Sequence, residues 1–245
     1  MKLQKGGNLA YIVGYKFSIN SDTASRIASD KYATYEVLKK ANIPVIEHKM
    51  IFNPRIRKNY PSDIKNIREL VQYLIQNQRR IVIKPNDGHG GKGVYLCKSR
   101  GEIMTTVKKL FKTKESVSVC PYYDIDIEYR VIMLDGECKL LFGKKKAESE
   151  WKCNLNQGAS VVTGVDENLR AELIKIAKEA VKVIGIRFAS VDIIQTKTRE
   201  LLIIEVNSGV TIHRYAQIVE NGREIAKEIY SEAIKKMLFI NDKKD

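Results

Sequence analysis

A glycine-rich segment of the chain has the composition of a phosphate-binding loop. Gly88-His89-Gly90-Gly91-Lys92-Gly93 holds four glycines and a lysine in six residues. Glycine adopts backbone conformations that other residues avoid, so such a loop can turn its N–H groups toward an anion. Lys84, on the strand expected to enter the loop, adds a positive charge suited to an α- or β-phosphate. The segment therefore predicts a phosphate-bearing ligand.

The residues after the loop decide which nucleotide-binding motif it fits. A dinucleotide-binding fingerprint requires a helix directly after the glycines, but Val94-Tyr95-Leu96-Cys97 is a β-like run. A Walker A motif requires Ser or Thr after its lysine, and Lys92 is followed by Gly93. The chain contains neither the H-R-D nor the D-F-G motif of protein kinases. A strand–loop–strand hairpin over a triphosphate remains, or a glycine-rich surface hairpin without a ligand.

The segment ASVDIIQTKTRELLIIEVNSG predicts two strands and a pair of carboxylates. If the strands pair antiparallel about Thr198–Arg199, Asp192 lies opposite Glu205 with Cβ atoms about 5 Å apart. Asn207 then faces the same side. Such carboxylates repel each other unless a cation neutralises them, and oxygen ligands without His or Cys select Mg²⁺ or Mn²⁺. The alternative is an exposed hairpin with incidental acids. A magnesium site beside a glycine loop indicates nucleoside triphosphate chemistry.

Strands and helices that could position these residues alternate along the chain, which predicts an α+β fold with more than one lobe. Periodicity and capping residues predict helices that start at Asp30 and Ser62, cover 102–112 and 169–184, and carry Ile225, Ile229 and Met237. Strands are predicted at 9–17, 81–84, 94–97, up to 119, 128–134, 137–142, 189–195 and 201–206. We divide the chain into a short segment 1–29, a first lobe 30–120 and a second lobe 121–245.

Composition is compatible with a soluble globular protein that favours anionic partners. Of the 245 residues, 44% are hydrophobic and 29% charged, and 43 Lys and Arg against 29 Asp and Glu give a net charge of +14. This field favours nucleotides, polyanions, nucleic acid or an acidic protein. Four cysteines without a C-x-x-C pair indicate reduced thiols, and the chain shows no signal peptide or membrane span. We expect a cytoplasmic protein without membrane association.

Segments from residue 30 to about 209 resemble the ATP-grasp superfamily, in particular the branch of bacterial glutathione synthetase and the ribosomal-protein glutamate ligase. They are SDKYATYEVLKKANIPV, IVIKPNDGHGGKGV, YRVIMLDGE, WKCNLNQGA and VDII…IIEVNSG, in the family's order. Each segment alone is weak evidence for the family, but the occurrence of all five in the family's order is specific to it. The resemblance implies an ATP-grasp fold, in which two α+β lobes enclose ATP, with Mg²⁺ or Mn²⁺ as cofactor.

The resemblance also implies a role for each matching residue. Phosphate contacts are implied for Lys31 and Lys84, covered by the loop residues Gly88, His89, Gly90, Gly91, Lys92 and Gly93. The implied adenine hinge is Val119, Cys120, Pro121 and Tyr122, with Asp124 or Asp126 as ribose partner. The implied magnesium ligands are Asp192, Glu205 and Asn207. Arg130 and Asn154 are implied on the phosphoryl or substrate side.

Lys144 falls where relatives carry an arginine that serves the acyl phosphate. Lysine keeps the charge but lacks the planar fork of arginine, so either Lys144 or Lys146 is expected to take this role. Relatives also have a substrate-binding domain before the helix at Asp30, whereas 29 residues precede it here. We expect a pocket that is smaller, shared across a dimer or completed by a partner. The apolar run from Leu9 to Phe17 is expected to pack on the second lobe or across a two-fold interface, with a homodimer favoured.

These features predict an ATP-dependent carboxylate–amine ligase that forms an amide or peptide bond through an acyl phosphate. Its substrates are expected to be an anionic carboxylate, free or attached to a carrier, and an amine. One alternative is an ATP-grasp kinase that phosphorylates a small-molecule hydroxyl and forms ADP without an amine. Another is a basic nucleic-acid-binding protein, against which the chain shows no zinc, helix-turn-helix or RNP-like motif.

Overall fold

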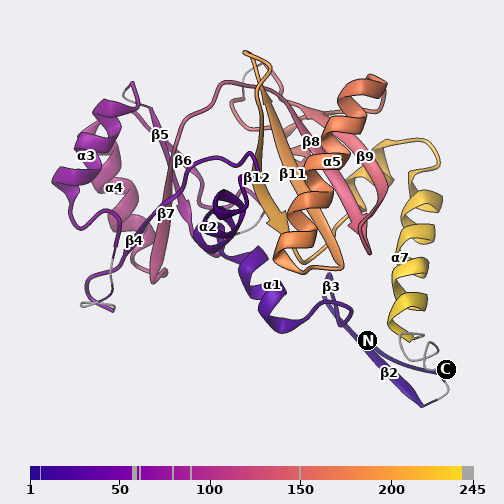
Figure 1. Ribbon diagram of the computed structural model, residues 1–245. Coiled ribbons are helices and arrows are strands. Elements are labelled where there is room, and N and C mark those ends of the chain that lie inside the picture. Colours follow the sequence, from indigo (N-terminus) through magenta and orange to yellow (C-terminus); the bar gives the residue numbers. More distant parts are fainter. Residues whose placement is uncertain are drawn as a thin grey trace.

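The computed structural model describes residues 1–5, 7–56, 60, 62–78, 80–88, 90–148 and 150–238. Three antiparallel sheets and their helices make up this part of the chain (Figure 1), with strand orders β1-β2-β3, β4-β7-β5-β6 and β10-β9-β8-β11-β12. The predicted α+β class is therefore confirmed. Of the helices in the described ranges, none combines the length and the apolar composition that crossing a bilayer requires.

The elements have the following bounds. The helices are α1 Asp22–Ser29, α2 Lys31–Lys40, α3 Ile67–Gln76, α4 Arg100–Leu110, α5 Glu167–Ile184, α6 His213–Ile218, α7 Gly222–Leu238 and the short 3₁₀-helix η1 Leu155–Gln157. The strands are β1 Lys2–Lys5, β2 Asn8–Val13, β3 Lys16–Phe17, β4 Lys49–Phe52, β5 Ile81–Pro85, β6 Tyr95–Cys97, β7 Ser116–Pro121, β8 Ile125–Leu134, β9 Glu137–Lys145, β10 Ser160–Val162, β11 Phe188–Thr196 and β12 Leu201–Asn207.

The four-stranded sheet forms the first lobe, and α3 and α4 share an apolar core with it. The predicted start of α3 is wrong. Its cap is Asn66, whose side chain accepts a hydrogen bond from the backbone N–H of Glu69 at 3.1 Å. Ser62 does not cap the helix: it lies four residues before Asn66, and its hydroxyl instead accepts a hydrogen bond from the backbone N–H of Phe52. The segment between them is therefore a loop that closes onto β4.

The five-stranded sheet forms the second lobe. α5 covers one face of it, and α1 and α2 complete that layer (Figure 1). The strands predicted at 128–134 and 137–142 are confirmed as β8 and β9, which pair as a hairpin with positive φ at both turn residues, Asp135 and Gly136. α6, α7 and the N-terminal sheet cover part of the opposite face through a second apolar core. The rest of that face carries polar side chains.

The pairing predicted for the last two strands is confirmed. Asp192 lies opposite Glu205, and an irregularity follows in which Ile193 pairs with Ile203. Ile203 and Ile193 then join the core beneath α5, whereas the carboxylates stay on the opposite face. The irregularity therefore separates the polar part of β12 from the apolar part within a few residues.

A small apolar cluster, here called the interlobe cluster, joins the two lobes. It contains Val82 and Cys120 from the first sheet, Ile194 and Leu202 from the second, and Ile46. Because both sheets contribute to it, a flat molecule inserted at this place would contact both lobes.

The N-terminal residues form more structure than the sequence predicts. The single strand predicted over 9–17 is wrong: a turn at Gly14, with φ of 59°, divides it into β2 and β3, and β1 pairs with β2. The helix α1, capped by Ser21, was also not predicted. Ala10 and Phe17 face the core of the second lobe, so the expected packing on this lobe is confirmed. The homodimer stays a prediction, which light scattering tests.

Candidate active site

The candidate site lies on the polar part of the second lobe's sheet. Arg130 on β8, Asp192 on β11 and Glu205 on β12 form one row across three neighbouring strands. Along β12, the chain runs from Leu202 in the interlobe cluster to Glu205 and Asn207. The row therefore begins where the two lobes meet and continues away from that place.

Asp192 is surrounded by positive charge. Arg130 donates hydrogen bonds to both carboxylate oxygens, at 2.8 and 2.7 Å, and Lys144 lies 3.4 Å from one of them. Lys144 also donates to Glu128. Burial acts to raise the pKa of Asp192, but Arg130 and Lys144 outweigh it and hold that pKa below its ordinary value. These four residues, here called the buried ion cluster, have formal charges that cancel.

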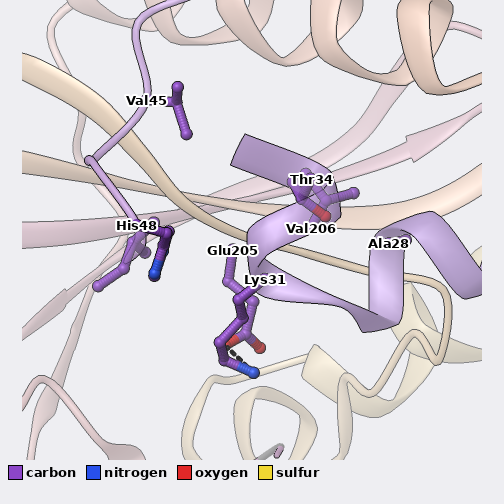
Figure 2. Close-up of a pocket in the computed structure, with 8 residues that line it drawn as sticks. Ala28, Lys31, Thr34, Val45, His48, Glu205 and Val206 are labelled. Carbon is purple, nitrogen blue, oxygen red and sulfur yellow. Dashed lines mark ion pairs between the residues drawn. The ribbon is translucent and has the colours of Figure 1, made fainter. Parts of the chain in front are cut away.

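Glu205 has weaker partners than Asp192. Within the described residues it forms an ion pair with Lys31, at 3.8 Å (Figure 2). Its side chain is 23% exposed, compared with 4% for Asp192. Asn207 follows on the same strand, with its amide nitrogen 3.4 Å from Asp192. Glu205 is therefore the carboxylate of the row that remains most available to a bound cation.

Lys31 and Lys84 bring two ammonium groups into a nearly enclosed place. Their exposed fractions are 7% and 5%. Lys31 donates to the carbonyl of Gly88, whereas the ammonium group of Lys84 forms neither a hydrogen bond nor an ion pair with any described residue. Burial lowers the pKa of Lys31, and Lys84 lowers it further, against the opposing effect of Glu205. Buried ammonium groups need counter-charge, so this place suits an anion such as a phosphate group.

The glycine loop closes over this place. Gly90, Gly91 and Gly93 have φ of 67°, 70° and 71°, which favours glycine at all three. The side-chain amide of Asn154 donates to the carbonyl of Gly90 at 3.4 Å. A Cβ atom on Gly91 would lie 2.9 Å from that amide nitrogen. The glycines thus allow the loop of the first lobe to approach Asn154 of the second. His89 lies outside the described residues.

A cavity of about 500 Å³ opens next to the interlobe cluster. Its lining residues are Arg80, Leu96, Lys98, Tyr122, Lys146, Glu148, Glu150, Trp151 and Lys197. The rings of Tyr122 and Trp151 are 6.2 Å apart and tilted. Flat rings and apolar groups at a lobe junction, with polar groups at the rim, are typical of a site for a heterocyclic ligand.

The predicted hinge residues differ in where they point. Cys120 and Tyr122 contact the interlobe cluster, whereas Val119 packs into the core of the first lobe. Pro121 pairs with Ile81 in the sheet. Among this group, Cys120 and Tyr122 are therefore the side chains placed to contact a ligand between the lobes.

The remaining predicted acids and lysines lie in three different environments. Asp124 forms ion pairs with Lys146 at 3.4 Å and Lys197 at 3.1 Å, beside the cavity. Asp126 is exposed, as is Lys92 of the glycine loop. Lys144 instead lies inside the buried ion cluster. The structure thus brings Lys144, and not Lys146, next to Arg130 and Asp192.

Three residues of the site were missed by the sequence analysis. Glu128 lies two residues before Arg130 on β8, so strand alternation could have placed it on the same face. Asn86 accepts a hydrogen bond from the backbone N–H of Tyr32 at 3.1 Å and thereby ties α2 to the start of the glycine loop. His48 is buried beside Lys31 (Figure 2), 2.5 Å from the hydroxyl of Ser118. Burial, with Lys84 and Lys31, holds the pKa of His48 well below its ordinary value.

Comparison with known proteins agrees with this arrangement. A family model described as a RimK-like ATP-grasp domain matches residues 28–233. A probable alpha-L-glutamate ligase of Psychromonas ingrahamii is 24% identical over 199 residues, which cover 79% of this chain and 59% of that protein. The chain thus spans less than two thirds of that relative.

Solved structures show the same fold. The D-alanine-D-alanine ligase of Coxiella burnetii superposes with a TM-score of 0.66 at 18% identity, over 89% of this chain and 60% of that one. The ATP complex of the Bacillus anthracis D-alanine–D-alanine ligase gives 0.64 at 16%, over 89% and 70%. Fold and site define a two-lobed protein of the ATP-grasp class. The chain belongs to the RimK-like ATP-grasp family.

Proposed function

We propose that this protein is an ATP-dependent carboxylate–amine ligase. The observation that carries the proposal is the pair of buried lysines, Lys31 and Lys84, which lie between a glycine loop and the Glu205–Asn207 strand. Two enclosed positive charges next to an available carboxylate suit a triphosphate that arrives with a divalent cation. Family membership and the name of the glutamate ligase relative support the same reaction class.

ATP fits the site with its base between the lobes. The adenine would contact the interlobe cluster and the cavity lined by Tyr122 and Trp151. The triphosphate would then extend along β12 toward Glu205, beneath the glycine loop. Lys84 and Lys31 would bind the phosphates, and Asp124, which forms ion pairs with the cavity-lining Lys146 and Lys197, would be the ribose partner.

The residues present also fit magnesium held together with ATP. Within the described ranges, no three His, Cys, Asp or Glu side chains group closely enough to hold a metal ion alone. Mg²⁺ commonly binds through one or two carboxylates plus substrate phosphates, which Glu205, Asn207 and, from inside the buried ion cluster, Asp192 could complete. When bound, the ion would neutralise charge that develops on the transferred phosphoryl group.

The proposed chemistry has two steps. A substrate carboxylate attacks the γ-phosphate, which forms an acyl phosphate and releases ADP. An amine then attacks the acyl carbon, which forms the amide bond and releases phosphate. We assign to Arg130 and Lys144 the fixed positive charge that would stabilise the oxygens of the transferred phosphoryl group and the oxyanion formed when the amine attacks the acyl carbon. Asn154 would hold the glycine loop near the reacting groups. A small-molecule or carrier-bound carboxylate and a cytoplasmic location complete the proposal.

ADP release measured against pools of amino acids and dipeptides tests this function. L-Glutamate comes first because of the name of the relative. We expect ADP release that requires both a carboxylate and an amine, with an amide product detected by mass spectrometry. ADP release without an amine, together with a stable phosphorylated product, would instead indicate a kinase.

We expect ATP affinity to depend on the two buried lysines. Replacing Lys84 or Lys31 by Met removes a charge-assisted contact of about 1.5–3 kcal/mol, so Kd for ATP should rise about ten- to a hundredfold. Titration of each variant with ATP and magnesium measures this. Lys40→Met is the matched control, because Lys40 lies at the other end of α2 from Lys31 and is exposed, so the change should have little effect. Equal affinity of Lys84→Met and wild type would contradict the phosphate assignment.

We expect Lys144 and Lys145 to differ sharply in their effect on turnover. Lys144 is buried beside Arg130 and Asp192, whereas the neighbouring Lys145 is exposed. Lys144→Ala should therefore lower kcat more than it raises the KM for ATP, because the lost charge acts on the reacting groups. Lys145→Ala should leave both constants unchanged. Steady-state kinetics with the substrates identified by the ADP-release screen measures both constants. A larger loss of kcat in Lys145→Ala than in Lys144→Ala would mean that Lys144 is not the catalytic cation.

A further inference from the structure

The end of β12 indicates where the second substrate binds. The strand runs from the interlobe cluster at Leu202, past Glu205, and ends at Asn207, from which the chain continues to Gly209. If the base of ATP lies at the interlobe cluster, the γ-phosphate points toward the Gly209 end. Gly209 lies two residues beyond Asn207, about 7 Å along an extended chain. Whatever surrounds Gly209 is therefore next to the substrate that attacks the γ-phosphate.

The N-terminal sheet reaches this place. Lys16 on β3 forms an antiparallel bridge with Gly209. A Cβ atom on Gly209 would lie 3.8 Å from the Cβ atom of Tyr15. Figure 1 shows β3 at the lower end of the large sheet, while β2 extends away from it. The turn between β2 and β3 therefore borders the substrate side of the site.

The residues that follow the turn are fixed by packing and hydrogen bonds to the second lobe. Phe17 packs edge-on against Phe188 at 5.0 Å and stacks on Tyr230 at 5.8 Å. Asn20 donates to the carbonyl of Phe188 at 2.7 Å and accepts from its N–H at 2.8 Å. Because these contacts anchor the chain directly after the turn, Tyr15 has a defined position beside the site.

Tyr15 is exposed beside the Gly209 end of the site. It is 53% exposed, and the next residue, Lys16, is exposed as well. Tyr230, whose ring stacks on that of Phe17, donates to the carbonyl of Val210, the residue after Gly209, at 3.3 Å. Tyr15 therefore offers an aromatic ring and a hydroxyl to a molecule bound beyond Asn207.

We propose that Tyr15 contacts the non-nucleotide substrate, as a specificity-determining residue, and shields the transferred phosphoryl group from water. The ring covers the end of the site beyond Asn207, and the hydroxyl binds a polar group of a substrate whose negative charge faces Arg130 and Lys16. This inference rests on the proposed function, because it takes its direction from the placement of ATP.

The test compares Tyr15→Ala and Tyr15→Phe with wild type on the full chain. For Tyr15→Ala, we expect the KM of the non-nucleotide substrate to rise about tenfold, with the KM for ATP unchanged. Tyr15→Phe should lie between them because it keeps the ring. Tyr11→Ala is the matched control, because Tyr11 lies on the same small sheet, is 48% exposed and pairs with Lys2 instead of approaching Gly209. A wild-type substrate KM for Tyr15→Ala overturns the inference.

A parallel Glu205→Gln variant separates failure of this inference from failure of the proposed function. If Glu205→Gln keeps wild-type ADP release, the proposed site is wrong and the inference falls with it. If Glu205→Gln stops ADP release but Tyr15→Ala behaves as wild type, the Tyr15 inference alone is wrong. If no second substrate is found, the rate of ADP release with ATP and magnesium alone tests the inference. This rate should be higher in Tyr15→Ala than in wild type because water reaches the phosphate, and an unchanged rate overturns the inference.

Discussion

Glu205→Gln is expected to remove magnesium-dependent turnover while leaving the fold intact. The substitution keeps the shape of the side chain and removes the charge that a cation requires. Metal stabilisation of a transferring phosphoryl group contributes several kcal/mol, so kcat/KM should fall at least about a hundredfold. Because Glu205 has an ion pair of 3.8 Å with Lys31 and is partly exposed, its neutralisation should change the melting temperature little.

The measurements are ADP release over a range of magnesium concentrations and thermal unfolding without nucleotide. Glu200→Gln is the matched control, because Glu200 lies in the hairpin turn before β12 and its backbone, not its side chain, bonds to Thr196. We expect this control to keep wild-type turnover. Near-normal turnover of Glu205→Gln at every magnesium concentration would contradict the assignment of Glu205 as a magnesium ligand.

The sequence was sufficient for the pair of carboxylates that builds the site, although the turn alone does not fix it. Asp192 and Glu205 lie symmetrically about Thr198–Arg199 and pair in the structure. Nearer the turn, Gln195 pairs with Leu201, one residue out of that symmetry, and the irregularity after Asp192 restores it. The glycine loop was equally legible, since its neighbours are strands in both the sequence pattern and the structure. Both features depend on residues close together along the chain.

The surroundings of Asp192 were not predictable in the same way. Arg130 lies 62 residues away along the chain and reaches Asp192 because β8 pairs with β11. No local pattern specifies which strands become neighbours in a sheet of five. The sequence alone therefore showed two carboxylates that repel each other, whereas the folded protein supplies Arg130 and Lys144 to one of them.

The N-terminal region illustrates a second kind of error. Apolar residues from Leu9 to Phe17 suggest one strand, and the turn that divides it contains a single glycine, Gly14, with φ of 59°. The small sheet is then stabilised by Phe17 and Ala10 on the core of the second lobe. This tertiary packing, and not local propensity, decides where such short strands end.

The expected effect of Asp192→Asn on the stability of the folded protein has opposite signs with and without the buried ion cluster. If Asp192 faced only Glu205, removing its charge would relieve repulsion and stabilise the protein in the absence of a metal. In the structure, its carboxylate instead accepts two hydrogen bonds from Arg130 and lies 3.4 Å from Lys144. Neutralising it leaves Lys144, whose side chain is 6% exposed, and Arg130, at 22%, with Glu128 as their remaining carboxylate in the cluster.

We therefore expect Asp192→Asn to destabilise the protein without nucleotide or metal. Breaking a buried ion pair by removing one partner costs about 3–5 kcal/mol. Chemical denaturation measures the loss, and Glu205→Gln under the same conditions should show much less. The carboxyl pKa of Asp192 is lowered, so its stabilisation is present above the unfolded-state pKa of about 4 and is lost as the pH falls through the folded-state value. The difference between variant and wild type should accordingly shrink in strong acid. Equal or greater stability of Asp192→Asn at neutral pH would mean that Arg130 and Lys144 do not hold Asp192 in the folded protein.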